Sequence, residues 1–169
     1  MAACLVSMIL LGWTACGYRL VGRGGFLPPG IQSIGVPTFA NLTDRPELEQ
    51  RISEEILTQL QTRTRRRTSA VGTGVDAVLR GEVTSFRSVP VEFNPDGRAR
   101  TIEVTITVRA SLTSTADHQV IWAADHFVFR ESYPVGEQAI QFVDQETLAL
   151  ESVAGDFAEA VVTSILEGF

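Results

Sequence analysis

Cys16 is the residue of this 169-residue chain whose position most clearly predicts chemistry. It follows an uncharged apolar stretch, residues 5–13, and the small residues Thr14 and Ala15, and it is followed by Gly17. This pattern is typical of a bacterial lipoprotein signal, in which the leader is cut before the Cys and the Cys then carries lipid. The alternative is a buried Cys in an ordinary apolar segment. The stretch is shorter than the roughly 20 apolar residues of a spanning helix, so we do not expect a transmembrane anchor.

The leader divides the chain into three expected parts. Residues 1–15 form the signal peptide, residues 16–30 a tether rich in Gly and Pro, and residues 31–169 a single domain. Cys4 lies in the leader, so the mature chain has no second Cys for a disulfide or for a Cys-based metal site. We expect no cofactor other than the covalent lipid on Cys16.

The basic residues are unevenly distributed along the chain. All 14 are Arg and none follows Arg130, whereas residues 131–169 carry eight acidic residues and no basic one. The formal net charge of −6 disfavours nucleic-acid binding, because phosphate contacts dominate such affinity. The densest basic cluster is Arg63 with residues 65–67, which fits either the exposed last turn of a helix or a phosphate contact.

Two further arginines, Arg98 and Arg100, follow the strong turn signal of residues 94–97. We expect them at the tip of a hairpin, where guanidinium groups could bind phosphate or carboxylate with two hydrogen bonds each. The alternative is a solvated hairpin end with no ligand.

Catalytic groups are scarce. His118 and His126 are the only histidines, and we expect His118 in a solvated turn. His126 follows Asp125 on a predicted strand, where neighbouring side chains point to opposite faces and cannot converge on one ion. We therefore expect neither a catalytic site nor a metal site, and no enzyme.

The hydrophobic pattern predicts two helices and four strands. The first helix has Asp44 as its cap, Pro46 in its first turn and an apolar stripe that ends at Leu60. The second helix is capped by Asp144, and Gly155 inside it indicates close packing. The clearest strand is the one after the 94–97 turn, with alternate apolar and polar residues. The predicted strands are residues 31–39, 77–93 with a bulge near 84–87, 101–113 and 120–133, and the second helix is residues 145–166.

The order β-α-β-β-β-α predicts an α/β (α+β) fold. We expect a two-layer sandwich in which a four-stranded mixed sheet carries both helices on its apolar face. The helix between the first two strands predicts a right-handed parallel crossover if these strands lie side by side.

Several segments, taken in order, resemble the LptE family of lipopolysaccharide-assembly lipoproteins. The likeness begins at the Cys-Gly pair of the lipoprotein signal and runs to the end of the chain. The segments are residues 16–20, 27–31, 36–41, 76–83 and 164–169.

The resemblance implies a non-enzymatic outer-membrane lipoprotein that faces the periplasm. Members of this family partner and plug the LptD β-barrel, which inserts lipopolysaccharide into the outer leaflet, and they bind lipopolysaccharide themselves. With no basic residue after Arg130, lipopolysaccharide binding here would depend on Arg98 and Arg100 or on earlier arginines. The alternative function is a lipoprotein that activates a cell-wall synthase or belongs to a secretion channel, which the segment 36–41 before an acidic helix also resembles.

Overall fold

The computed structural model describes residues 27–135 and 139–168, with side chains described outside 139–149. The predicted signal peptide, Cys16 and most of the tether lie outside the described residues.

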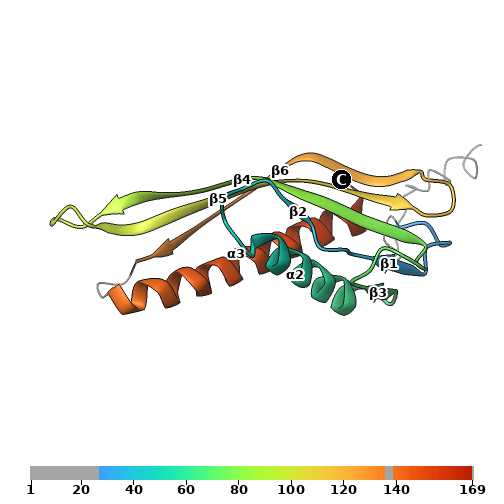
Figure 1. Ribbon diagram of the computed structural model, residues 1–169, viewed down its shortest axis with the longest axis horizontal. Helices are drawn as coiled ribbons and strands as arrows, with labels where there is room; N and C mark the ends of the chain where they lie inside the picture. Colours follow the sequence, from blue (N-terminus) through green and yellow to red (C-terminus); the bar gives the residue numbers. More distant parts are fainter. Residues whose placement is uncertain (1–26, 136–138, 169) are drawn as a thin grey trace, which may run out of the picture.

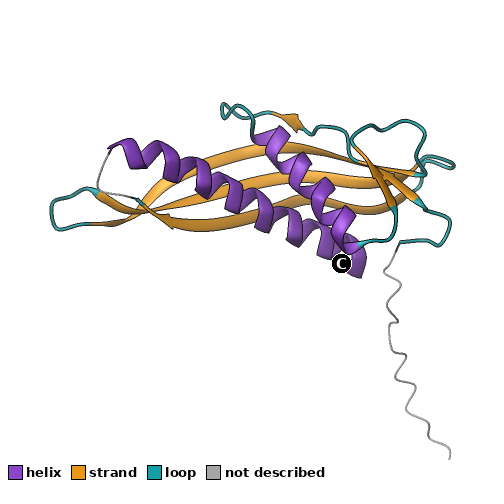
Figure 2. Cartoon of the chain, turned by 90° about the horizontal axis from the view of Figure 1, so that it is seen from below, coloured by secondary structure: helices purple, strands orange, loops and turns teal. Residues whose placement is uncertain are grey.

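Two layers make up the described part of the molecule. One layer is a six-stranded sheet with the order β3-β1-β4-β5-β6, in which β2 also pairs with β4. Both helices cover the same face of this sheet (Figures 1 and 2). The elements are β1 (Ser33–Gly35), β2 (Ala40–Asn41), α2 (Leu48–Arg63), β3 (Arg67–Ser69), β4 (Ala77–Phe93), β5 (Ala99–Ser114), β6 (Val120–Pro134) and α3 (Ala139–Glu167).

The predicted two-layer α+β arrangement is confirmed, but the count of four strands is wrong. β1, β4, β5 and β6 correspond to the expected strands, and β1 pairs with β4 in parallel, as predicted. The expected strand 31–39 is broken, because Pro37 has no N–H to donate and pairing resumes only at β2. β3 has three residues between α2 and β4, where no strand was predicted.

Both helix starts differ from the prediction. α2 begins at Leu48 after Glu47, which has a left-handed backbone and no capping side-chain bond, so Asp44 is not the cap. The side chain of Asn41 organises the preceding loop instead: its Nδ2 donates to Arg45 O at 2.7 Å, and its Oδ1 accepts from Thr43 N at 2.9 Å. α3 begins at Ala139, so position 144 lies inside the helix. Residues 139–143 contain neither Gly nor Pro to stop a helix from starting earlier.

The long β4–β5 hairpin contains the bulge that was expected. The register shifts between Val83 and Ser85, and Thr84 Oγ1 donates to Thr107 O at 3.2 Å. Without the extra residue, Phe86 would point away from the helices; with it, Phe86 pairs with Ile106, which is fully buried. The turn is confirmed as well, since Gly97 N donates to Asn94 O at 2.9 Å.

The core lies between the sheet and the helices. Phe157 of α3 is fully buried and contacts Phe127 and Phe129 of β6 edge to face, with ring centroids 5.5 and 6.3 Å apart. The alternating residues of β5 supply the largest part of the sheet's buried face, as predicted, and α2 adds its apolar stripe. These buried side chains are Ile102, Val104, Ile106, Val108, Ala110 and Leu112 of β5 and Leu48, Ile52, Ile56 and Leu60 of α2.

Gly81 lets an aromatic ring lie directly on the sheet. Phe39 is buried, and a methyl group added at Gly81 would overlap its ring. The backbone N–H of Phe39 is also held, since it donates to Ser53 Oγ at 2.9 Å. Gly155 of α3 has no such neighbour: an added methyl group would meet nothing within 4 Å, so the expected close packing there is wrong.

We predict that Gly81→Ala lowers the free energy of unfolding by about 1–3 kcal/mol, because the Phe39 ring must move. Gly155→Ala is the matched control and should raise it by about 1 kcal/mol, because Gly is a poor helix former. Urea unfolding of both variants measures these changes. Equal stability of Gly81→Ala and the parent protein would contradict the packing described.

Asp76 fastens β1 to the start of β4. Its Oδ2 accepts hydrogen bonds from Ser33 Oγ at 2.8 Å and from the N–H groups of Ser33 and Gln32, each at 2.9 Å. The bond from the Ser33 side chain, followed by those from the backbone and by the charge of Arg67, lowers the pKa of Asp76 below its ordinary value.

A lowered pKa stabilises the fold where Asp76 is ionised. The stabilisation is complete above the ordinary aspartate pKa and is lost as the pH falls through the lowered one. Asp76→Asn should therefore be less stable than the parent protein at about pH 7, and the difference should shrink at about pH 2. The urea midpoints of both proteins at the two pH values measure this difference in stability. A difference that is constant with pH would contradict the role of the charge.

Candidate functional site

The β4–β5 hairpin projects along the longest axis of the molecule. β4 and β5 have 17 and 16 residues, and their connecting turn forms one end of the molecule, at the left of Figure 1. β1, β3 and the turn between β5 and β6 lie at the other end (Figure 1). We call residues 89–100 the hairpin tip.

Arg98 and Arg100 lie in the hairpin tip, as the sequence predicted. Both are exposed, and they flank Ala99, which pairs with Phe93 across the hairpin. No acidic side chain of the described residues forms an ion pair with either of them. The backbone of Arg100 is fixed, since its carbonyl accepts from Val135 N at 2.8 Å. The two guanidinium groups are therefore available to a ligand.

Two acidic residues share the tip with these arginines. Glu92 Oε2 accepts a hydrogen bond from Thr101 Oγ1 at 2.8 Å. Asp96 lies in the turn and is exposed. The formal charges of the four side chains cancel, so the tip does not attract anions through net charge.

The sheet face opposite the helices is polar and uncovered by any described element (Figure 1). Its β5 side chains include Glu103, Thr105 and Arg109, and Arg109 forms an ion pair with Glu82 of β4. Arg87 and Arg130 lie on either side of Thr105. The face is mostly polar, but it also carries the exposed side chain of Val128, which pairs with Thr107.

The basic cluster at the end of α2 has a structural role at one position. Arg63 donates to Thr163 Oγ1 at 2.7 Å and to Glu159 O at 3.3 Å, so it joins α2 to α3 and is not simply a solvated last-turn residue. Arg65 and Arg67 are exposed.

The histidines are not assembled with other reactive groups. His118 is exposed in the β5–β6 turn with a left-handed backbone, φ 57°, and His126 is exposed on β6. Among the described residues, no three His, Cys, Asp or Glu side chains are grouped to hold a metal ion.

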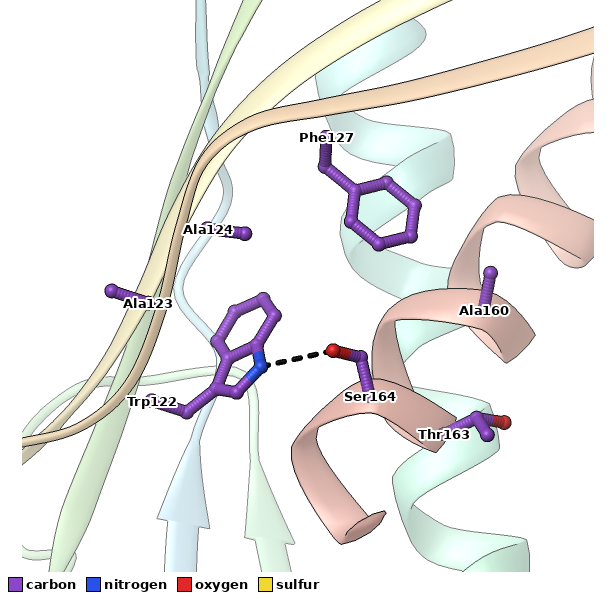
Figure 3. A pocket seen from close by; sticks show the side chains of 7 residues that line it. All are labelled: Trp122, Ala123, Ala124, Phe127, Ala160, Thr163 and Ser164. Atoms are coloured by element: carbon purple, nitrogen blue, oxygen red, sulfur yellow. Dashed lines mark hydrogen bonds between the residues drawn. The ribbon is translucent and has the colours of Figure 1, made fainter. Parts of the chain in front are cut away.

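An apolar pocket of about 510 Å³ lies between β6 and α3. In Figure 3 Trp122 and Phe127 face it from the strand, and Trp122 Nε1 donates to Ser164 Oγ at 3.0 Å across it. The pocket is far from the hairpin tip, because Trp122 pairs with Leu112 near the opposite end of β5. Its lining residues are Trp122, Ala123, Ala124, Phe127, Ala160, Thr163 and Ser164.

Residues 31–165 match the family model described as LptE, lipopolysaccharide-assembly. The chain belongs to the LptE family. No curated protein matches it significantly in sequence. No helix in the part of this LptE-family chain that the structure describes is long and apolar enough to cross a membrane.

Solved structures of low sequence identity share the LptE-like fold of this chain. Lipoprotein B from Nitrosomonas europaea is 14% identical with a TM-score of 0.57, covering 89% of this chain and 90% of that one. The PelC dodecamer from Paraburkholderia phytofirmans is 18% identical with a TM-score of 0.55, covering 85% and 93%. Rare lipoprotein B from Shewanella oneidensis is 15% identical with a TM-score of 0.50, covering 79% and 92%.

The apolar residues of the tip are the part of the site that the sequence did not predict. Val91 and Phe93 were assigned to a strand, yet both are exposed. The sequence pattern carries no signal for this exposure, because apolar residues in a strand are normally buried and the extent of the helix layer depends on the three-dimensional fold.

We predict that Ala160→Leu, which adds apolar volume to the pocket, raises the free energy of unfolding by about 0.5–2 kcal/mol. Ala154→Leu on the same helix is the matched control: Ala154 is fully buried, so overpacking should cost about 1–3 kcal/mol. Thermal unfolding distinguishes the two. Destabilisation by Ala160→Leu would mean that the pocket cannot accept a side chain.

Proposed function

We propose that this protein is a lipid-anchored subunit of lipopolysaccharide assembly on the periplasmic side of the outer membrane. It binds lipopolysaccharide through Arg98 and Arg100 and partners a β-barrel of the LptD type, which it plugs. The observation that carries the proposal is the pair of exposed arginines at the end of a projecting hairpin, in a chain of the lipopolysaccharide-assembly family.

Arginine suits the phosphates of lipopolysaccharide. Its guanidinium group stays charged at all physiological pH values and offers parallel N–H donors to a phosphate. Arg98 lies at the end of the turn and Arg100 in β5, with Ala99, the first residue of β5, between them. Two such groups can contact one phosphate or two neighbouring phosphates.

The uncovered sheet face supports a barrel as the partner. The interior of a membrane barrel is polar and holds water. A face with Thr105, Arg109 and Glu103 can approach such a wall through hydrogen bonds and ion pairs. This role requires no catalysis, only a sheet face that is complementary to the wall of the barrel.

Lipid on Cys16 supplies the anchor in this proposal. One acyl chain binds a membrane only marginally, whereas several chains on one Cys hold it firmly. Gly17 after the Cys fits sorting to the outer membrane.

Arg98→Glu/Arg100→Glu should weaken lipopolysaccharide binding by about tenfold or more, because charged hydrogen bonds to phosphate are lost. Arg65→Glu/Arg66→Glu is the control with the same charge change, and it should bind like the parent protein. Binding is measured as the retention of purified lipopolysaccharide on the immobilised full chain. Equal losses in the two variants would refute a specific site at the tip.

The barrel partner is tested separately by purifying the tagged chain from its own envelope in detergent. We expect a large outer-membrane β-barrel at about one copy per chain. Recovery of a penicillin-binding protein would support the alternative, an activator of a cell-wall synthase.

A component of a secretion channel is the second candidate function. It is favoured by the fold shared with PelC, which is described as a dodecamer, at a TM-score of 0.55. Sedimentation of the purified chain decides: a ring of many copies supports the channel, and a single copy in a complex with a barrel supports lipopolysaccharide assembly.

A further inference from the structure

The apolar side chains next to Arg98 and Arg100 indicate which part of the ligand the tip contacts. We infer that the tip binds lipopolysaccharide at the boundary between its phosphates and its acyl chains, with Phe93 and Val91 against the acyl chains. The inference rests on the proposed function and specifies the chemistry of the same site.

Exposed apolar side chains are concentrated at the tip. Of the seven large apolar side chains that are exposed among the described residues, three lie within residues 89–93. Val89 is 44% exposed, Val91 47% and Phe93 60%. Three exposed apolar side chains within five residues favour a contact with another molecule, because water solvates them poorly.

The backbone pairs Phe93 with the segment that carries the two guanidinium groups. Phe93 pairs with Ala99, and the chain on either side of Ala99 carries Arg98 and Arg100. Register shifts between Pro90 and Glu92 and between Glu92 and Phe93 interrupt the regular alternation of side chains. Phe93, Arg98 and Arg100 thus all belong to the same short end of the hairpin.

The charges at the tip also require an apolar contribution. Glu92 and Asp96 offset Arg98 and Arg100, so no net positive charge draws a polyanion to the hairpin. The phosphates of a ligand would compete with the carboxylates of Glu92 and Asp96 for the two guanidinium groups. Transfer of Phe93 from water to an acyl environment supplies the additional affinity.

Lipopolysaccharide has the matching arrangement. Its phosphates are attached to the same sugars that carry its acyl chains, so charged and apolar groups lie next to each other in the ligand. A soluble phosphorylated sugar would engage the arginines and leave Phe93 and Val91 in water.

The test compares intact lipopolysaccharide with lipopolysaccharide from which the acyl chains have been removed and the phosphates kept. Phe93→Ser should weaken the binding of intact lipopolysaccharide to the full chain by about tenfold and leave the binding of the deacylated form unchanged. Val71→Ser, a control 57% exposed at the other end of the molecule, should change neither. Arg98→Glu/Arg100→Glu should weaken both.

A second variant, Phe93→Trp, keeps the apolar ring and reports on its surroundings. Its emission should shift to shorter wavelength with intact lipopolysaccharide but not with the deacylated form, above the constant signal of the buried Trp122. Equal losses for both ligands in Phe93→Ser, or no shift in Phe93→Trp, would overturn the inference while leaving the proposed function in place. Unchanged binding of both ligands by Arg98→Glu/Arg100→Glu would instead refute the proposed function. Equally tight binding to phosphatidylglycerol vesicles that also depends on Phe93 would overturn the inference, because the tip would then be a general membrane contact.

Discussion

The need to hide one face of the sheet from water determines the rest of the structure. β5 presents six buried apolar side chains to the helices and a row of polar ones to the other side. A sheet of this pattern is stable only if another layer covers its apolar face. α2 and α3 both lie on that side, with Phe157 of α3 at the centre of the contact. The opposite face and the far end of the hairpin are thereby left free for function.

Two ion pairs between the helices use part of the chain's unevenly distributed charge. α2 carries Arg51 and Arg63, and α3 carries Glu151 and Glu159, which pair with them at 3.1 and 3.9 Å. Such half-exposed pairs contribute at most about 1 kcal/mol each, so they align the helices more than they stabilise them. Arg51 and Arg63 therefore serve to join the two helices.

The elements with strong periodicity could be predicted from the sequence, and the short ones could not. β5 alternates strictly over its length, and the extra residue near Thr84 was visible as a break in the alternation of β4. β2 has two residues and β3 has three, too few to show any period. The start of α2 was misplaced because hydrogen bonds of the Asn41 side chain with Thr43, Arg45 and Glu49 organise the loop, and Asp44 does not cap the helix.

The positions of Arg98 and Arg100 could be predicted because a turn signal precedes them, whereas the exposure of Phe93 could not. An apolar residue in a strand is normally read as buried, and whether a helix reaches far enough to cover it depends on the three-dimensional fold. In this protein the tip extends past the helix layer (Figure 1). Strand alternation alone therefore underestimates the apolar surface that is available to a ligand.

The segments that carry the family resemblance mainly build the scaffold. Phe39 lies on Gly81, Asn41 holds the loop before α2, and Asp76 holds Ser33. Each of these residues has a packing or hydrogen-bonding reason for its identity. Because Arg98 and Arg100 lie outside all of those segments, the resemblance supports the fold and the family but does not identify the ligand site. The site must be argued from the hairpin itself, where exposed cations and exposed apolar groups occur together.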